Sequence, residues 1–239
     1  MRLLFSERTS RQESDSHESC QTAIAVLYRY LGKSYMYTLT NEEFEIQAEP
    51  WLRKVFTLNN LIVEPFMPEI SARRLLYPCF GDLHDAIPMK TLVNAATLVG
   101  DHSCYISLGA RNERGPFHCC IPLTKLQEGY DGQPNSPTLI GIQLGMHVYQ
   151  PFTTIFSDHG KWGIFLCGDG LAILGGVPEF VGVLQDEIPN FDTQVYEYLE
   201  SLKSFQEYGM NLTIEWLPGL LRHLYDKRQM EDMLKVLRD

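Results

Sequence analysis

The sequence predicts an α+β protein, in which an antiparallel sheet within residues 100–175 packs against an N-terminal helix and C-terminal helices. Three observations support this prediction. The 239 residues are 44% hydrophobic and 21% charged, which is ordinary for a globular protein with a sizeable core. Strand-like segments cluster in the middle of the chain, and segments with helical periodicity lie on either side of them. Grouped strands and grouped helices favour α+β over a doubly wound parallel sheet.

The N-terminal part is expected to begin with a frayed tail and continue as a helix. Residues 1–14 are polar, and residues 15–239 are expected to form one globular domain with a sub-boundary near residue 85. Asp15 is followed three residues later by Glu18, as in a capping box, and Gly32 ends the pattern. The apolar positions between them recur at helical spacing: Cys20, Ala23, Ile24, Leu27, Tyr28 and Leu31.

The following segment is divided by five prolines, so each of its elements must be short. A strand is predicted over Tyr35 to Leu39 and another over Leu61 to Val63. One or two helical turns are predicted over Ser71 to Tyr77. Apolar residues on one side of Met89 to Val99 predict a short helix.

Two hairpins are predicted in the central part. Strands over Ser103 to Leu108 and Phe117 to Leu123 flank a polar turn, and a Gly/Pro-rich loop follows from Gly129 to Pro137. Strand-like segments come next, at residues 139–144 and 146–149. A second hairpin joins residues 162–167 to 171–174 through Gly168-Asp169-Gly170, which provides the positive φ angles that a tight turn requires.

Helices are predicted after Gly175-Gly176. Pro178 suits a first helical position, and Pro189 ends that helix. Asn190 or Asp192 is expected to cap the next helix, over residues 192–208, whose inward side chains are expected to be Val195, Tyr198, Leu199, Leu202 and Phe205. A short strand or helix is expected over Leu212 to Leu217, and one or two further helices complete the chain.

The sequence predicts a cytoplasmic protein. The apolar stretch at the start is shorter than a secretory signal requires, and no run of about 18 apolar residues would span a membrane. The six cysteines are therefore expected to be reduced and mostly buried.

No metal ion or cofactor is predicted. The pairs His102/Cys104 and His118/Cys120 have zinc-ligand chemistry, but a turn centred between residues 113 and 114 would place Cys120 opposite Ser107 and spread the four side chains along the hairpin. The Gly-Asp-Gly turn lacks the third glycine of a dinucleotide fingerprint.

One interpretation of the sequence is a small hydrolase-like enzyme with its site around the second hairpin. Cys167, with His159 as its base and either Asp158 or Asp169 as the orienting group, has the residue types of a thiol nucleophile, and Trp162 lies close by in the chain. The cluster of Asp82, His84 and Asp85 offers a further pair of carboxylates, but a solvated loop is the favoured explanation for these polar residues.

The favoured interpretation is a protein-binding or regulatory module, for example an inhibitor or immunity-type protein that docks a basic protein. The net charge of −10 argues against nucleic acid or an anionic membrane as the partner. Residues 176–216 contain eight acidic residues and only Lys203 as a base, which accounts for −7 of that charge. The predicted docking residues are Glu197, Glu200, Glu207, Tyr196 and Tyr208. The basic residues that follow in the C-terminal helices are expected to pair internally.

Overall fold

A computed structural model describes residues 36–79, 83, 86–108, 116–130, 153–168, 170–209 and 213–237. The chain divides into two compact units, Met1–Tyr35 and Met36–Asp239, and every described residue belongs to the second. The helix predicted from Asp15 and the strand-like segments at 139–149 lie outside the described residues.

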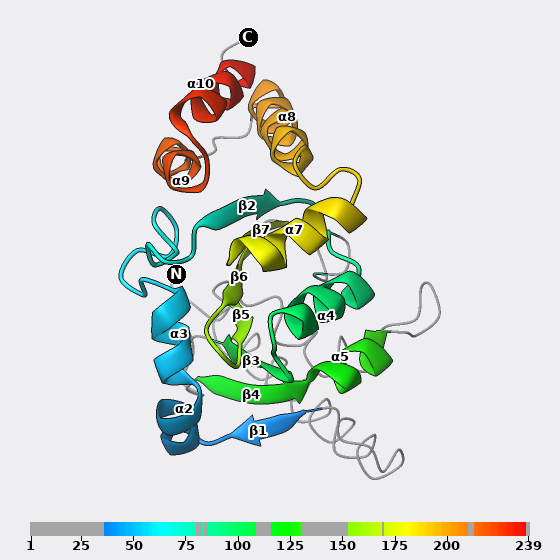
Figure 1. The fold of residues 1–239 in the computed structure, drawn as a ribbon. Helices are drawn as coiled ribbons and strands as arrows, with labels where there is room; N and C mark the ends of the chain where they lie inside the picture. Colours follow the sequence, from blue (N-terminus) through cyan, green and yellow to red (C-terminus); the bar gives the residue numbers. More distant parts are fainter. Residues whose placement is uncertain are drawn as a thin grey trace, which may run out of the picture. The chain divides into compact units, whose positions relative to one another are not determined.

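The predicted α+β class is confirmed. A seven-stranded antiparallel sheet has the order β1-β4-β3-β5-β6-β7-β2, with β1 at one edge and β2 at the other (Figure 1). The strands are β1 (Tyr37–Leu39), β2 (Ala72–Leu76), β3 (Ser103–Leu108), β4 (Phe117–Pro122), β5 (Thr153–Ser157), β6 (Trp162–Gly168) and β7 (Leu171–Gly176).

Eight helices are described, and they occupy both sides of the sheet and its β2 edge (Figure 1). They are α2 (Asn41–Gln47), α3 (Glu49–Val55), α4 (Met89–Leu98), α5 (Leu123–Tyr130), α7 (Pro178–Glu187), α8 (Gln194–Glu207), α9 (Leu217–Leu224) and α10 (Lys227–Val236). Helices α4, α5 and α7 lie on one side, α2 and α3 lie on the other, and α8 and α9 contact β2.

The alternation of side chains along β7 gives the sheet two buried faces. Leu171 and Ile173 belong to a large core that also includes residues of α3, α8 and α9. Gly176 points to the opposite face, where a Cβ would lie 2.7 Å from the Phe180 ring of α7. On that face the buried Trp162 ring stacks on Phe180, with ring centroids 4.9 Å apart.

Two glycines let the segment after α3 approach the sheet. Gly163 of β6 and Gly175 of β7 are direct partners in the sheet register. A Cβ at Gly163 would lie 2.6 Å from both Val55 and Phe56. A Cβ at Gly175 would lie 2.7 Å from Ile70. Because both positions lack a side chain, these buried residues pack directly on the strand backbone.

Side chains from the C-terminal helices bind the outer edge of β2. The Leu75 N–H donates to the Tyr225 hydroxyl at 3.1 Å, and the N–H of Tyr77, just after the strand, donates to Gln194 Oε1 at 2.9 Å. The Arg73 guanidinium donates to the backbone carbonyl of His223 at 2.8 Å. The first two contacts satisfy backbone N–H groups at this edge of the sheet, whereas the Arg73 contact joins β2 to α9.

Most elements with a strong local pattern are confirmed. The β6–β7 hairpin, α4, α7 and α8 occur where they were predicted, and Pro178 lies in the first turn of α7. Gly170 and Gly209 have positive φ angles at the predicted turn and helix end.

Several predictions for less regular segments are wrong. Residues 71–77 contain β2 rather than helical turns, because antiparallel pairing with β7 outweighs the helix preference of Ala-Arg-Arg-Leu-Leu. Residues 61–63 form a turn rather than a strand, and residues 213–216 are neither helix nor strand. Gly129 lies within α5, not in a loop.

The expected caps and inward residues of α8 also need correction. Its N-cap is Thr193, with no side-chain cap. The Asp192 carboxylate instead binds Arg74, and the Asn190 amide reaches Glu197. Phe205 is 40% exposed rather than inward, because it lies at the end of the helix beyond the core.

The β3–β4 register differs from the predicted one by two residues. Cys120 pairs with Tyr105 and not with Ser107, which pairs with His118. The connection between the strands is long, and long connections specify register less tightly than two-residue turns.

Candidate functional site

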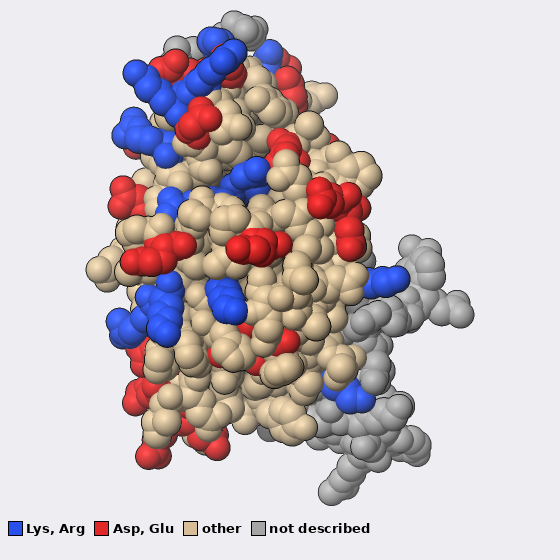
Figure 2. Space-filling view, viewed as in Figure 1, with Lys and Arg blue, Asp and Glu red and all other residues tan. Residues whose placement is uncertain are grey.

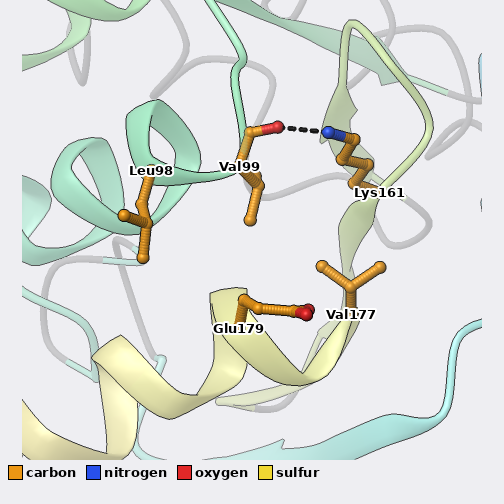
Figure 3. A pocket seen from close by; sticks show the side chains of 5 residues that line it. All are labelled: Leu98, Val99, Lys161, Val177 and Glu179. Carbon is orange, nitrogen blue, oxygen red and sulfur yellow. Dashed lines mark hydrogen bonds between the residues drawn. The ribbon is translucent and has the colours of Figure 1, made fainter.

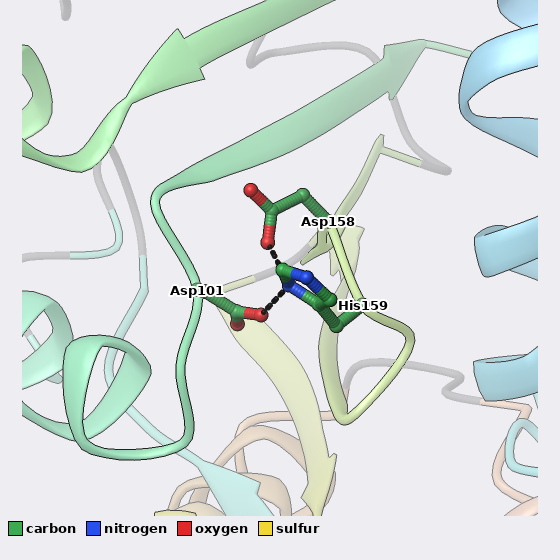
Figure 4. A group of neighbouring side chains, drawn as sticks. All are labelled: Asp101, Asp158 and His159. Carbon is green, nitrogen blue, oxygen red and sulfur yellow. Dashed lines mark hydrogen bonds and ion pairs between the residues drawn. The ribbon is translucent and has the colours of Figure 1, made fainter.

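A cluster of two aspartates and one histidine lies where β3 begins and β5 ends (Figure 4). Asp101 lies between α4 and β3, two residues before the strand begins, whereas Asp158 and His159 lie in the turn between β5 and β6. The antiparallel pairing of β3 with β5, in which Cys104 faces Ser157, brings these distant segments together. Among the described residues, this is the one group of three potential metal-ligating side chains with its ligand atoms within 4.8 Å of one another.

The imidazole of His159 lies between the two carboxylates. Its Nδ1 is 3.1 Å from Asp101 Oδ1 and 2.7 Å from Asp158 Oδ1. The side chain of Asp101 is fully buried, that of Asp158 is 13% exposed, and that of His159 is 47% exposed. The cluster therefore opens to the surface through the histidine.

Each carboxylate is held by further hydrogen bonds. Asp101 accepts bonds from the Ser157 hydroxyl at 2.8 Å and from Trp162 Nε1 at 2.5 Å. Asp158 Oδ2 accepts bonds from the backbone N–H and the hydroxyl of Ser103, at 2.9 and 2.8 Å. The carboxylate orientations are thus determined by residues of three adjacent strands.

Burial and mutual contact shift the pKa values of the three groups. Burial, followed by the neighbouring Asp158, raises the pKa of Asp101 to about 6. Burial also acts to raise the pKa of Asp158, but hydrogen bonds from Asp101, Ser103 and His159 outweigh it and lower that pKa. The hydrogen bond to Asp158 raises the pKa of His159. The cluster therefore favours a protonated histidine beside an ionised Asp158.

The predicted partners of His159 are not all brought to it. Cys167 lies five residues beyond Trp162 along β6, so the strand rise places it roughly 17 Å from the turn that carries His159. Its side chain packs against the large core. Asp158 contacts His159 directly. Trp162 does so only indirectly, because its indole donates to Asp101, which in turn contacts His159. Asp169 lies outside the described residues.

The cysteines and histidines of the β3–β4 hairpin do not form a zinc-like group of three among the described residues. Cys104 and Cys119 are fully buried, and burial raises the pKa of Cys104 well above its usual value and that of Cys119 to about 12. His118 stacks on Phe44 with centroids 3.6 Å apart, and burial lowers its pKa. These shifts disfavour thiolate chemistry.

Comparison with known proteins finds no matching family model, no matching curated protein and no matching solved structure. Within the described part of the chain, no helix has both the length and the apolar character needed to cross a membrane.

The predicted docking residues are all exposed on α8 or at its end. Tyr196 is 37% and Tyr208 87% exposed, and the three glutamates Glu197, Glu200 and Glu207 are exposed too. At about 100° per residue, all five fall within an arc of roughly 120° on the helix. Among the described residues, none of the three glutamates forms an ion pair with a lysine or arginine.

A hollow of about 450 Å³ lies between the end of α4 and the start of α7 (Figure 3). Leu98, Val99 and Val177 supply its apolar lining, and Lys161 and Glu179 supply its charges. The Lys161 ammonium donates a hydrogen bond to the Val99 carbonyl, so it is engaged in capping α4. A small-molecule site normally has several convergent polar groups, which this lining does not provide.

The sequence did not single out Asp101. It lies 57 residues from Asp158, and only the β3–β5 pairing joins them. No segment covering β5 was predicted as a strand, so no local signal linked the two carboxylates.

Proposed function

We propose that this protein is a cytoplasmic binding module that docks a basic protein partner on the exposed face of α8. Glu197, Glu200 and Glu207, together with Tyr196 and Tyr208, define this surface, which we term the α8 face. An inhibitor or immunity-type protein that neutralises a basic toxin is one concrete form of the proposal.

The observation that carries the proposal is the placement of exposed aromatic rings beside the glutamates. Tyr196, Phe205 and Tyr208 are among the seven large hydrophobic side chains that are exposed in the described residues, and all three lie on α8 or at its end. Tyrosine is enriched where interfaces have their strongest contacts. Exposed aromatics on an otherwise polar helix are therefore suited to anchor a partner.

The charge around the α8 face complements a basic partner. Helix α8 contains three glutamates and one lysine, and the preceding segment adds Asp186, Glu187 and Asp192. Figure 2 shows acidic side chains near the end of α7 and basic side chains gathered over α9 and α10. A local surplus of one sign mainly speeds association and selects the partner by its charge.

Charge reversal tests the proposal. The triple variant E197K/E200K/E207K should lose the partner that the wild-type chain captures from native cytosol at low salt, because like charges would then face each other. E42K/E45K/E69K is the matched control, since it changes three exposed glutamates elsewhere by the same total charge. Capture that survives in the α8 variant, or that fails equally in the control, contradicts a docking role for α8.

A second candidate function is hydrolysis at the turn between β5 and β6. The observation that favours it is His159, whose Nδ1 is held by two carboxylates while its imidazole remains half exposed. A histidine oriented in this way can transfer a proton, as a general acid when it is protonated and as a general base when it is neutral. Because Cys167 lies far along β6, water would be the nucleophile, so H159A should abolish turnover of a panel of ester and phosphoester substrates while C167S retains it. Loss in C167S alone would place the chemistry elsewhere.

A further inference from the structure

We propose that Asp101, Asp158 and His159 bind one divalent first-row transition-metal ion, with Zn²⁺ as the best match. The site is independent of the α8 face. The ligand atoms would be one oxygen of each carboxylate and Nδ1 of His159, which already converge on one point (Figure 4).

The spacing of the ligand atoms fits a small ion. Nδ1 of His159 lies 3.1 Å from the Asp101 oxygen and 2.7 Å from the Asp158 oxygen, and all three atoms lie within 4.8 Å of one another. Ligands about 2.0–2.2 Å from a common zinc ion are roughly 3.0–3.6 Å apart. The Asp158 contact would need to open by only a few tenths of an ångström.

The charge of the cluster is a second, independent indication. Two carboxylates share this largely buried place, and His159 is the one basic group within ion-pair distance of either among the described residues. Lys161 does not contribute, because its ammonium binds the Val99 carbonyl. Even with His159 protonated, the cluster has a net charge of −1. A divalent cation bound to neutral imidazole would balance both carboxylates.

Hydrogen bonds from neighbouring residues orient both carboxylates for metal binding. Ser157 and Trp162 donate to Asp101, and Ser103 donates twice to Asp158, so both carboxylates are oriented before any ion arrives. The exposure of His159 leaves room for entry of the ion and for water as a remaining ligand.

The donor atoms favour a transition metal over Mg²⁺ or Ca²⁺. Imidazole nitrogen is a ligand suited to zinc, iron, nickel and copper, whereas Ca²⁺ takes six to eight oxygen atoms and Mg²⁺ retains several waters. A site with one nitrogen and two carboxylates therefore selects against the hard cations.

Calorimetric titration of the metal-free full-length chain tests the proposal, with ZnCl₂ as the probe and MgCl₂ and CaCl₂ as comparators. We expect one Zn²⁺ per chain in the wild type, and at least tenfold weaker binding in H159Q and D158N. H102Q is the matched control. His102 is an exposed histidine beside the cluster that contacts Asp158 through its backbone N–H alone, so H102Q should bind like the wild type.

Two further measurements keep the outcome unambiguous. Circular dichroism shows whether each variant is folded. The titration does not include D101N, because Asp101 is the most deeply buried of the three ligands and its replacement would change stability as well as metal binding. Absorption spectra with Co²⁺ distinguish nitrogen and oxygen ligands from cysteine ligands, which would add a thiolate-to-cobalt band. The proposal is overturned by a dissociation constant weaker than about 1 mM, by a thiolate band, or by equal binding in folded H159Q and D158N.

Discussion

Neighbouring donors favour the ionised form of Asp101. Its fully buried side chain accepts hydrogen bonds from Ser157 and Trp162, with His159 alongside. Burial nevertheless raises its pKa to about 6 from its ordinary value of 3.8. The folded chain therefore holds a proton on Asp101 in a pH range where the unfolded chain has released it.

The pKa shifts of Asp101, His159 and Asp158 determine how the stability of the protein depends on pH. As pH rises from about 4 to about 6, the folded state loses stability relative to the unfolded state, because ionisation of Asp101 is easier after unfolding. The raised pKa of His159 adds stability at low pH that is lost as pH rises through its folded value, and the lowered pKa of Asp158 adds stability that is lost in acid.

The variant D101N should remove the loss of stability that ionisation of Asp101 causes. Its melting temperature relative to the wild type should rise as the pH increases from about 4 to about 6, because the variant has no carboxylate to ionise there. Thermal unfolding at several pH values checks this. A wild-type-minus-variant difference that does not change with pH would mean that Asp101 titrates normally.

At the scale of elements, glycine positions decide how closely α3 and the sheet pack. In G163A, the new methyl group would meet Val55 and Phe56 at 2.6 Å. We expect it to lower the free energy of unfolding by roughly 1–3 kcal/mol through overpacking. Urea denaturation measures the change.

G182A is the matched comparison for this prediction. Gly182 lies in α7, and a Cβ there would have no heavy atom within 4 Å. Alanine favours the helix, so this variant should raise the free energy of unfolding by about 0.5–1 kcal/mol. If the free energy of unfolding changes in the same direction in both variants, the close contacts at Gly163 do not determine the effect of G163A.

The hydroxyl of Tyr225 links an element from the C-terminal end to the sheet. It is the acceptor for the Leu75 N–H, and burial raises its own pKa to about 12. Y225F should lower the free energy of unfolding by about 1–3 kcal/mol, because it leaves a backbone donor of β2 without a partner. Denaturation in urea measures the change in stability, and hydrogen exchange of the Leu75 amide reports on the hydrogen bond itself. Unchanged exchange would mean that water replaces the hydroxyl.

How much was predictable from the sequence depends on whether the signal is local. The β6–β7 hairpin and α7 have local markers, Gly-Asp-Gly and Pro178, and both were predicted. Strand β2 and the β3–β4 register depend on partners far along the chain, and the sequence did not predict them. The candidate metal site was missed for the same reason, since Asp101 meets His159 only after β3 and β5 pair.

At the scale of the whole molecule, helices α8 and α10 differ in how far their charges are paired. Two basic residues of α10 are paired within the helix, Lys227 with Glu231 at 3.9 Å and Lys235 with Asp232 at 2.6 Å, which confirms the expected internal pairing for these two. The glutamates of α8 lack such partners among the described residues. The α8 face is therefore the larger source of uncompensated charge.

Association with a basic partner should accordingly depend on salt. The wild-type association rate should fall steeply as ionic strength increases, whereas E197K/E200K/E207K should show a flat or inverted dependence. Y196A/Y208A should instead mainly speed dissociation, because it removes contacts and leaves the charge unchanged. Surface plasmon resonance separates the two rates; identical salt slopes for wild type and the charge variant would contradict steering by α8.

The hydrogen bonds from the β2 edge to Tyr225 and Gln194 have a consequence for self-association. An uncovered edge strand is a template on which a second chain can add its own strand, and such addition leads to swapped dimers or fibrils. Here the helices that bring these side chains come last in the chain. Until residues 194–225 have been synthesised and folded back, the β2 N–H groups that Tyr225 and Gln194 bind lack these partners, so the C-terminal segment protects this edge of the sheet against strand addition.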